Sequence, residues 1–404
     1  MIAAQTELLR HEVPASADVV VIGGGVIGAA CCHALAEAGL ATALLEAEEL
    51  GSGASGACEG NVLVSDKSPG PELELARRSI ELYHDLAERL QADIQLESKG
   101  SLLVAVSDEA GEELRRESVW MRELGLQAEL LDGSAAHGAE PVLRPDLSAA
   151  LFVAEDLQVC PLKLVLALAL SSARLGARLI RRCKVEAVEL AGERVVGVRT
   201  SRGRIACSSV VVAAGLSTRE LMQTLELELP LVGRRGQLLV SAPSPGLITH
   251  KVYDFGYRAT VEEHEQGVQV ATVLETTRRG NVLIGASREF RETSDEPDVE
   301  VDALLAARAL ELAPGLAGIK ILRSYAGVRP TLPDGLPAIG GVPGIEGLWL
   351  ACGHEGAGIG LAPGTAEMIC SLISGGDTPV DPELFSPGRL MPSVGASLAK
   401  EEGD

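Results

Sequence analysis

An apolar run that turns through glycines into a helix constrains the fold more than any other feature of this chain. Residues 19–28 read Val-Val-Val-Ile-Gly-Gly-Gly-Val-Ile-Gly, and Glu46 closes a second apolar run about twenty residues later. This order predicts a strand, turn, helix and strand unit that binds a dinucleotide. Gly23 permits the tight turn, Gly25 lets backbone amides approach a pyrophosphate, and Gly28 lets the helix pack closely on the strand.

The acidic residue after the second strand selects among dinucleotides. A carboxylate at Glu46 accepts hydrogen bonds from ribose hydroxyls and repels a 2′-phosphate. The positive end of the helix meanwhile faces the phosphates. Glycine-rich turns also occur without nucleotides, but here strand, turn, helix, second strand and acid follow in order. We therefore predict FAD or NAD as the ligand and exclude a cofactor of the NADP type.

Charge and cysteine usage exclude several classes of function. The 404 residues include 57 acidic and 35 basic side chains, a net charge of −22, which repels nucleic acids and anionic membranes. No apolar stretch is long enough to span a bilayer, and residues 1–18 lack a signal-peptide core, so we expect a cytoplasmic chain. Eight cysteines without a Cys-x-x-Cys pair predict neither zinc nor an iron–sulfur cluster. Cys58 lies in a glycine-rich loop, where it is either a packing residue or a reactive thiol.

Hydrophobic periodicity predicts two interleaved layers. The spacing of apolar residues favours helices over 71–92, 109–124, 161–175 and 300–312, and strands over 101–106, 184–188, 195–198 and 210–214. Residues 229–290 are β-rich and broken by Gly and Pro, whereas 348–373 return to strand, turn and helix. We expect disorder only in the last dozen residues. The chain thus predicts an α/β fold with α+β elements, in which a Rossmann-like domain is interleaved with an antiparallel β-rich domain.

Three further motifs match one family. They are Val-Val-Val-Ala-Ala-Gly-Leu-Ser at 210–217, Gly-Val-Arg-Pro at 327–330 followed by Asp-Gly-Leu-Pro at 334–337, and Gly-His-Glu-Gly-Ala-Gly-Ile-Gly-Leu-Ala-Pro at 353–363. With the glycine fingerprint, they resemble the D-amino-acid oxidase family of flavoproteins in consistent order from about residue 18 to residue 373. The resemblance implies FAD, interleaved FAD-binding and substrate domains, and oxidation of a C–N bond. Because no Cys or His attachment motif is present, we expect the FAD to be non-covalent.

The resemblance also implies domain boundaries. We expect the FAD-binding domain over 18–100, 161–228 and 321–380, the substrate domain over 101–160 and 229–320, and a C-terminal tail over 381–404.

Positions that match the family's motifs imply the FAD contacts. These are Gly23, Gly25, Val26, Ile27 and Gly28 at the pyrophosphate; Glu46 and Ala47 at the ribose; Gly53, Ala54, Ser55, Glu59, Gly60 and Asn61 in the loop beneath the flavin; Val185 at the adenine; Ala214 and Gly215 at a supporting strand end; and Gly353, His354, Glu355, Gly356, Ala357, Gly358, Ile359 and Gly360 at the pyrimidine ring. Reduced flavin is anionic there, and amides at a helix start stabilise that charge.

Three residues are candidates for substrate chemistry. The resemblance implies that Arg329 pairs with the substrate carboxylate through two parallel hydrogen bonds, and a salt bridge with Asp334 is the structural alternative. Tyr253, in a segment that also carries His250 and Tyr257, is a substrate contact or a packing residue. His354 is a proton acceptor or acts through its backbone at the flavin. We expect Gly356 to leave room for substrates larger than glycine.

Within the family, residues 58–67, 234–237 and 283–290 most resemble the catalytic β subunits of dye-linked hydroxyproline or proline dehydrogenase, opine oxidase and hydrogen cyanide synthase. This implies a dehydrogenase for D-hydroxyproline, proline or an opine, with hydride transfer to flavin N5 and partner subunits that carry a second flavin and an iron–sulfur cluster. One alternative is a self-sufficient oxidase of the glycine or sarcosine type that produces hydrogen peroxide. Another is a non-catalytic flavin-binding subunit of an assembly.

Overall fold

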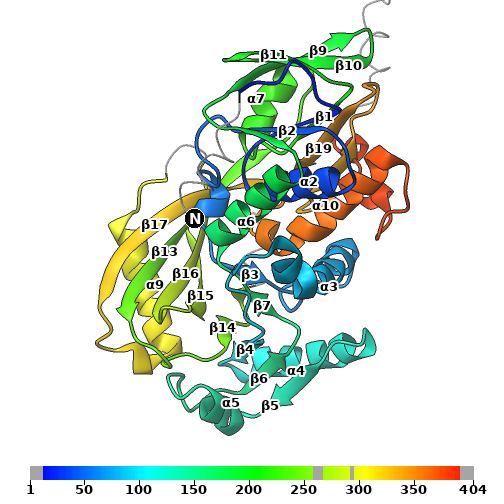
Figure 1. The fold of residues 1–404 in the computed structure, drawn as a ribbon. Helices are drawn as coiled ribbons and strands as arrows, with labels where there is room; N and C mark the ends of the chain where they lie inside the picture. Colours follow the sequence, from blue (N-terminus) through cyan, green and yellow to red (C-terminus); the bar gives the residue numbers. More distant parts are fainter. Residues whose placement is uncertain (1–11, 258–266, 292–294, 392–404) are drawn as a thin grey trace, which may run out of the picture.

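Two large β-sheets organise the molecule (Figure 1). The computed structural model describes residues 12–257, 267–291 and 295–391. The first sheet has the strand order β18-β19-β12-β1-β2-β8. Its strands are β1 (Val19–Ile22), β2 (Thr42–Leu45), β8 (Arg178–Ile180), β12 (Ser209–Val212), β18 (Ala338–Gly341) and β19 (Leu348–Cys352). All its neighbours pair in parallel except β18 and β19, which are antiparallel.

Helices cover one face of this sheet. They are α2 (Val26–Glu37), α6 (Pro161–Arg174) and α10 (Gly358–Ser374), and α2 packs against both α6 and α10 (Figure 1). Helix α3 (Pro71–Leu90) packs on α10. The first half of α2 reads Val-Ile-Gly-Ala-Ala-Cys, and five of these six residues are buried. Small residues let neighbouring helices and the strand approach α2 closely, so this helix lies between α6 and α10 on the six-stranded sheet.

A smaller antiparallel sheet covers the other face. It consists of β9 (Val185–Ala191), β10 (Arg194–Thr200) and β11 (Gly203–Ala206), and α7 (Ser217–Gln223) follows β12. Val198 and Ile205 of this sheet share a buried cluster with Val20 and Val210 of the large sheet. The strands of the large sheet are therefore buried on both faces, which explains their continuous apolar sequences.

The second large sheet has eight strands in the order β17-β13-β16-β15-β14-β4-β6-β5. They are β4 (Ser101–Ala105), β5 (Ala128–Leu131), β6 (Ala149–Val153), β13 (Val232–Pro243), β14 (Lys251–Asp254), β15 (Gln269–Thr276), β16 (Asn281–Phe290) and β17 (Ile321–Thr331). Neighbours are antiparallel except β4 and β14. Helix α9 (Val299–Leu312) packs on this sheet, α4 (Asp108–Glu123) packs on β6 and β5, and α5 (Gly133–Ala139) precedes β6.

Short elements connect the layers. Strand β3 (Asn61–Val62) pairs with β7 (Leu157–Gln158), and single 3₁₀ turns lie at Ala54–Gly56, Pro314–Leu316, Pro382–Phe385 and Pro387–Arg389. The predicted fold class, a Rossmann-like domain interleaved with an antiparallel domain, is confirmed.

The long strand β17 does not lie with the FAD-binding layer, to which we assigned residues 321–380. It pairs with β13 in the eight-stranded sheet, in a register that places Arg329 opposite Arg234. Its residues Ser-Tyr-Ala-Gly-Val-Arg-Pro show no alternation of apolar and polar side chains, so the sequence does not reveal this partner. The last dozen residues, which we expected to be disordered, lie outside the described residues.

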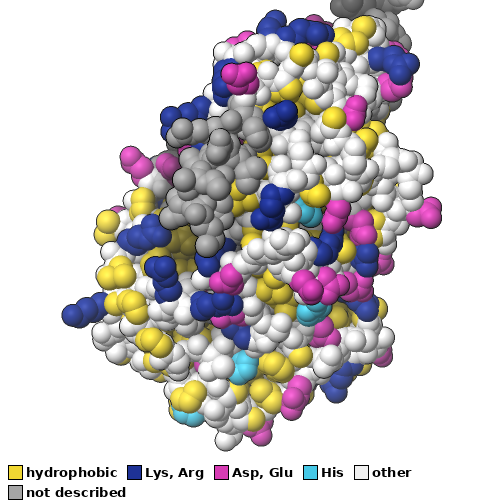
Figure 2. All heavy atoms as spheres, in the orientation of Figure 1, with side chains coloured by type: hydrophobic (Ala, Val, Ile, Leu, Met, Phe, Trp, Pro, Cys, Tyr) yellow, Lys and Arg dark blue, Asp and Glu magenta, His cyan; other side chains and the backbone are white. Residues whose placement is uncertain are grey.

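The surface carries charges of both signs. Figure 2 shows basic and acidic side chains interspersed over one face. Among the described helices, none combines the length and the apolar composition that crossing a membrane requires.

Candidate active site

A cavity of about 710 Å³ lies where the two large sheets meet, within the size range of ligand pockets. It brings together most of the predicted FAD contacts. Those that line it are Gly23, Gly25, Val26, Ile27, Glu46, Ala47, Gly53, Ala54, Ser55, Glu59, Asn61, Val185, Ala214, Gly215, Arg329, Gly353, His354, Glu355, Gly356, Gly358 and Ile359. Gly28, Gly60, Ala357 and Gly360 lie behind this lining. A sequence motif can therefore include residues that support the cavity wall without reaching a ligand.

The glycines at the end of β1 have different roles. Gly23 has a φ of 111°, and a Cβ there would lie 2.3 Å from the carbonyl oxygen of Ala213. At Gly28 a Cβ would lie 1.9 Å from the carbonyl oxygen of Gly23, so this glycine permits the contact of helix and strand. At Gly25 the nearest atom is Ser55 Oγ, at 3.2 Å. Gly25 therefore keeps the cavity wall open, as approach of a phosphate requires.

Polar groups at this end of the cavity suit a pyrophosphate and a ribose. The amide of Val26, in the first turn of α2, donates to Ser55 Oγ over 3.0 Å. The carboxylate of Glu46 accepts from the amide of Gly24 over 2.6 Å and from the amide of Glu48 over 2.8 Å. A helix start beside an oriented acid is the arrangement that binds a dinucleotide.

The segment before α10 forms the opposite wall. Gly353 has a φ of 78° and Glu355 one of 48°, and the amide of Glu355 donates to the carbonyl of Pro330 over 2.9 Å. This bond ties the segment to β17. The start of the 17-residue helix α10 therefore points its amides toward the cavity.

The imidazole of His354 is buried and bonded within the protein. Its Nε2 lies 3.0 Å from Thr365 Oγ1 of α10, and burial lowers the pKa of the ring from 6.5 to about 3. A ring with this pKa stays neutral near pH 7 and is a poor proton acceptor. The position of His354 therefore supports a backbone role at the cavity rather than acid–base chemistry.

This burial predicts a pH dependence of stability. The unfolded chain binds a proton at His354 below pH 6.5, whereas the folded protein does so only near pH 3, so stability falls as the pH falls through this window. Between pH 7 and pH 5 the free energy of unfolding should fall in both proteins. The fall should be about 2 kcal/mol smaller in His354→Gln than in the parent, because the variant has no imidazole to protonate in the unfolded chain. Urea denaturation at both pH values measures this. The exposed His84→Gln on α3 serves as the control, and an equal loss in His354→Gln and parent would contradict the prediction.

Arg329 extends from β17 across β13. A Cβ at Gly236 would lie 2.1 Å from Arg329 Nη1, so glycine at that position makes room for the guanidinium group. Nη1 also donates to the carbonyl of Ser287 over 3.2 Å. The alternative partner Asp334 is bound instead by Arg389, at 2.6 and 3.2 Å. Arg329 is thus held on the cavity wall, with 19% of its side chain exposed.

Two further arginines at this site escaped the sequence analysis. Glu355 Oε1 lies 3.9 Å from Arg234 Nη1, 3.7 Å from Arg288 Nε and 3.9 Å from Arg329 Nε. Burial raises the pKa of Glu355, but the three guanidinium groups outweigh it and hold this pKa below its ordinary value. The carboxylate therefore stays ionised. The sequence did contain a signal that could have identified Arg234. Arg234, Gly236 and Leu238 alternate along a strand, so they share one of its faces.

Tyr253 does not line the cavity. It is 2% exposed, and its hydroxyl contacts Ser65 Oγ, which is not part of the lining either. Tyr257 lies on the cavity wall instead, and the Arg288 guanidinium carbon is 4.4 Å from its ring centroid. The arrangement supports packing for Tyr253 and makes Tyr257 the aromatic candidate. The two tyrosines are only four residues apart, so strand alternation alone does not reveal which of them reaches the cavity.

The remaining candidates are inert in this geometry. The thiol of Cys58 donates to the carbonyl of Ser55 over 3.4 Å, and burial raises its pKa to about 12, so it stays protonated. His250 bonds to the carboxylate of Glu140 at 2.8 Å, outside the cavity lining. In the described part of the chain, His, Cys, Asp and Glu side chains form no group of three or more placed to hold a metal ion.

Comparison with known proteins identifies the family. Residues 18–372 match the DAO family, described as FAD dependent oxidoreductase. This chain belongs to that family. It is 32% identical over 385 residues to glycine oxidase of Pseudomonas putida, covering 93% of this chain and all of that protein. It is 28% identical to a hydrogen cyanide synthase subunit of Pseudomonas protegens over 90% of this chain and 94% of that one. The crystal structure of glycine oxidase from Geobacillus kaustophilus superposes with a TM-score of 0.84 at 28% identity, covering 92% and 98% of the two chains.

The cofactor of this DAO family member is FAD, and the cavity fits it. The glycine turn keeps the backbone open at Gly25, the start of α2 offers amides, and Glu46 is oriented where a ribose lies in such folds. At the other end, the start of α10 faces the space where the redox ring would lie. The pyrophosphate site and the ring site are therefore joined by one continuous cavity.

Proposed function

We propose that this protein oxidises the C–N bond of a small amino acid with FAD as the hydride acceptor, as a self-sufficient oxidase of the glycine type. The observation that carries this proposal is Arg329, a guanidinium group held over Gly236 on the wall of the cavity that begins at the glycine turn. The full-length similarity to glycine oxidase supports it. This reverses the order in which the sequence motifs ranked the oxidase and the dehydrogenase subunit.

The side chains around the cavity position the substrate. Arg329 pairs with the substrate carboxylate, which fixes the α-carbon relative to the redox ring. Bound FAD supplies a hydride acceptor at N5. Glu355 stays ionised between three guanidinium groups and keeps Arg329 oriented, while the neutral His354 braces the segment against Thr365. The product imine then hydrolyses in water.

We expect substrates larger than glycine to fit this site. A Cβ at Gly356 would have only Arg329 Nε and Cδ near it, at 3.6 and 3.7 Å. A methyl or ring substituent on the amino acid therefore has space beside Arg329. N-methylated and cyclic amino acids belong in any substrate panel for this protein.

The deciding experiment measures oxygen use. Protein reconstituted with FAD should consume oxygen and release one hydrogen peroxide per amine oxidised with glycine, sarcosine or a cyclic amino acid, without any partner chain. Acid precipitation should release the flavin into solution, because we expect it to be bound without a covalent link. Heat-denatured protein with free FAD is the control.

A dehydrogenase subunit is the second candidate, and the similarity to the hydrogen cyanide synthase subunit favours it. In that case D-hydroxyproline, proline or an opine would bleach the flavin without oxygen, but air would not restore its colour at a useful rate. Electrons would then leave through partner subunits with a second flavin and an iron–sulfur cluster. A flavin that no amine bleaches would instead indicate a non-catalytic subunit.

A further inference from the structure

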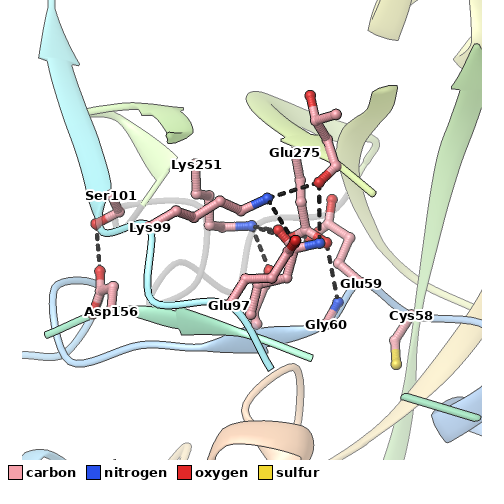
Figure 3. A network of polar contacts seen from close by, with 12 residues as sticks. Cys58, Glu59, Gly60, Glu97, Lys99, Ser101, Asp156, Lys251 and Glu275 are labelled. Atoms are coloured by element: carbon pink, nitrogen blue, oxygen red, sulfur yellow. Dashed lines mark hydrogen bonds and ion pairs between the residues drawn. The ribbon is translucent and has the colours of Figure 1, made fainter. Parts of the chain in front are cut away.

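A cluster of buried charges beside the cavity has no part in the mechanism above (Figure 3). It joins Glu59 and Asn61, at the end of the loop after η1 (Ala54–Gly56), to Lys251 of β14 and Glu275 of β15. Glu59 is 8% exposed, Lys251 3% and Glu275 1%. Buried ions are costly unless they are paired, so the arrangement of these groups calls for an explanation.

One oxygen of Glu59 is held firmly. Oε2 accepts from Asn61 Nδ2 over 2.9 Å and lies 3.9 Å from Lys251 Nζ. Lys251 Nζ in turn contacts Asn61 Oδ1 and lies 3.1 Å from Glu275 Oε2. Figure 3 shows Glu59, Lys251 and Glu275 converging from different elements, with the sulfur of Cys58 pointing away from them. The network therefore orients the Glu59 carboxylate.

The other oxygen of Glu59 lacks a hydrogen-bond donor among the residues that the structure describes. Oε1 is buried and has no hydrogen-bond partner within the described residues, although Glu59 lines the cavity. A Cβ at Gly285 of β16 would lie 2.6 Å from Oε1, so glycine there makes room for this oxygen. A buried carboxylate oxygen without a donor is unfavourable, and a donor group in the cavity would remove the penalty.

Glu59 and Arg329 both line the cavity, beside neighbouring positions of β13. Gly236 lies beneath the Arg329 guanidinium, and Leu238, two residues further along β13, packs against Gly285 and thus beside Oε1. Residues two apart on a strand share a face and are separated by roughly 7 Å. An α-amino acid bound through its carboxylate at one point and its amine at the other, with one hydrogen bond at each end, spans a distance of this order.

Three other titratable groups in the cavity lining are unsuited to receive an amine proton. His354 stays neutral with its ring bonded to Thr365, Cys58 is a protonated thiol, and Glu355 is enclosed by three guanidinium groups. Glu59 has one cation nearby and one oxygen to which no described residue donates a hydrogen bond, so its carboxylate is available to accept a proton.

We propose that Glu59 binds the substrate's ammonium group through Oε1 and removes one of its protons before hydride transfer. Asn61, Lys251 and Glu275 are positioning residues. The N–H bond breaks, its electron pair stays on nitrogen and the proton bonds to Oε1. The α-C–H bond then breaks, its hydrogen is transferred with the bonding electron pair to FAD, and the nitrogen pair forms the C=N bond, so the amine is oxidised and FAD is reduced. This inference rests on the proposed function.

The test is Glu59→Gln, which preserves the side chain's size, in FAD-loaded protein. Anaerobic flavin reduction by glycine and sarcosine at neutral pH should slow at least about 100-fold, the scale of general-base catalysis. The deficit should shrink by about tenfold or more at alkaline pH, where more amine is already neutral in solution. Acetate, a carboxylate without an amine, should bind with unchanged affinity, as judged by the shift in flavin absorbance. A parent-like rate, or a deficit that is the same at every pH, would overturn the proposal.

Matched variants separate the base from its surroundings. Glu140→Gln makes the same change at a buried carboxylate outside the cavity and should behave like the parent. Lys251→Met alone removes the cation that lies 3.9 Å from Glu59 Oε2 and leaves the Glu275 carboxylate in place, so the acidic limb of the rate profile should move to higher pH. If Glu59→Gln fails to retain flavin, the Lys251→Met variant carries the test, and an unshifted limb would refute the inference. A parent flavin that no amine bleaches would refute the proposed function itself, whereas bleaching at equal rates in parent and Glu59→Gln would refute only the role of Glu59.

Discussion

Gly25→Val is expected to produce folded protein that no longer retains FAD. Gly25 has extended backbone, with φ −73° and ψ −177°, which valine adopts readily. A Cβ at this position would meet only Ser55 Oγ, at 3.2 Å, so the fold tolerates the change. The branched side chain would nevertheless occupy the place where a pyrophosphate meets the amides of α2. Loss of two charge-assisted hydrogen bonds weakens FAD binding by about 3 kcal/mol or more, at least roughly 100-fold.

The ratio of flavin to protein after purification, followed by titration with FAD, measures this effect. Gly138→Val on α5 is the matched control, because Gly138 is exposed and a Cβ there would have no atom within 4 Å. Circular dichroism should show the same helix content in both variants. A yellow Gly25→Val protein with the parent's flavin content would mean that the pyrophosphate does not lie at this turn.

Arg329→Ala should weaken binding of the amino acid by about 2 to 4 kcal/mol while the flavin stays bound. The guanidinium group offers a carboxylate two parallel hydrogen bonds, and its loss leaves that charge without a partner in a partly enclosed cavity. Neighbouring Arg234 and Arg288 are only 2% exposed and are turned to Glu355, so they do not replace it. The apparent dissociation constant from anaerobic flavin bleaching should rise roughly 30-fold to 1,000-fold.

Two variants control this experiment. Arg323→Ala removes an arginine from the same strand that is exposed and stacks on Tyr325, and it should leave the affinity unchanged. Gly236→Ala keeps Arg329 but places a methyl group 2.1 Å from its Nη1, so the affinity should fall in the same direction by displacing the guanidinium. An unchanged dissociation constant in Arg329→Ala would remove this residue from the substrate site.

Local patterns predicted the parts of the site that depend on short stretches of chain. The turn at Gly23 and the close contact at Gly28 follow from backbone geometry within ten residues, and Glu46 follows at the end of the next strand. The helices were also predictable, because apolar residues recur at helical spacing: α3 ends at Leu90 and α6 begins at Pro161, within two residues of expectation.

The pairing of strands was harder to predict from the sequence. Short strands such as β14 and β18 carry too few residues for a period, and β17 has glycine and arginine where a strand usually alternates. Pairing of β17 with β13 joins residues about ninety positions apart. Because the pairing depends on the whole sheet, no short window of sequence contains it.

The sequence by itself determined the FAD-binding unit, the family and Arg329 as the substrate anchor candidate, since each depends on a contiguous motif. Only the tertiary structure decided what surrounds that anchor: Arg234 and Arg288 around Glu355, Tyr257 rather than Tyr253 at the cavity, and the Glu59 carboxylate held by Lys251 from almost two hundred residues away. The reason is physical. Backbone sterics and periodicity act within a few turns of chain, whereas charge pairing and burial depend on which distant side chains the packed sheets bring within a few ångströms.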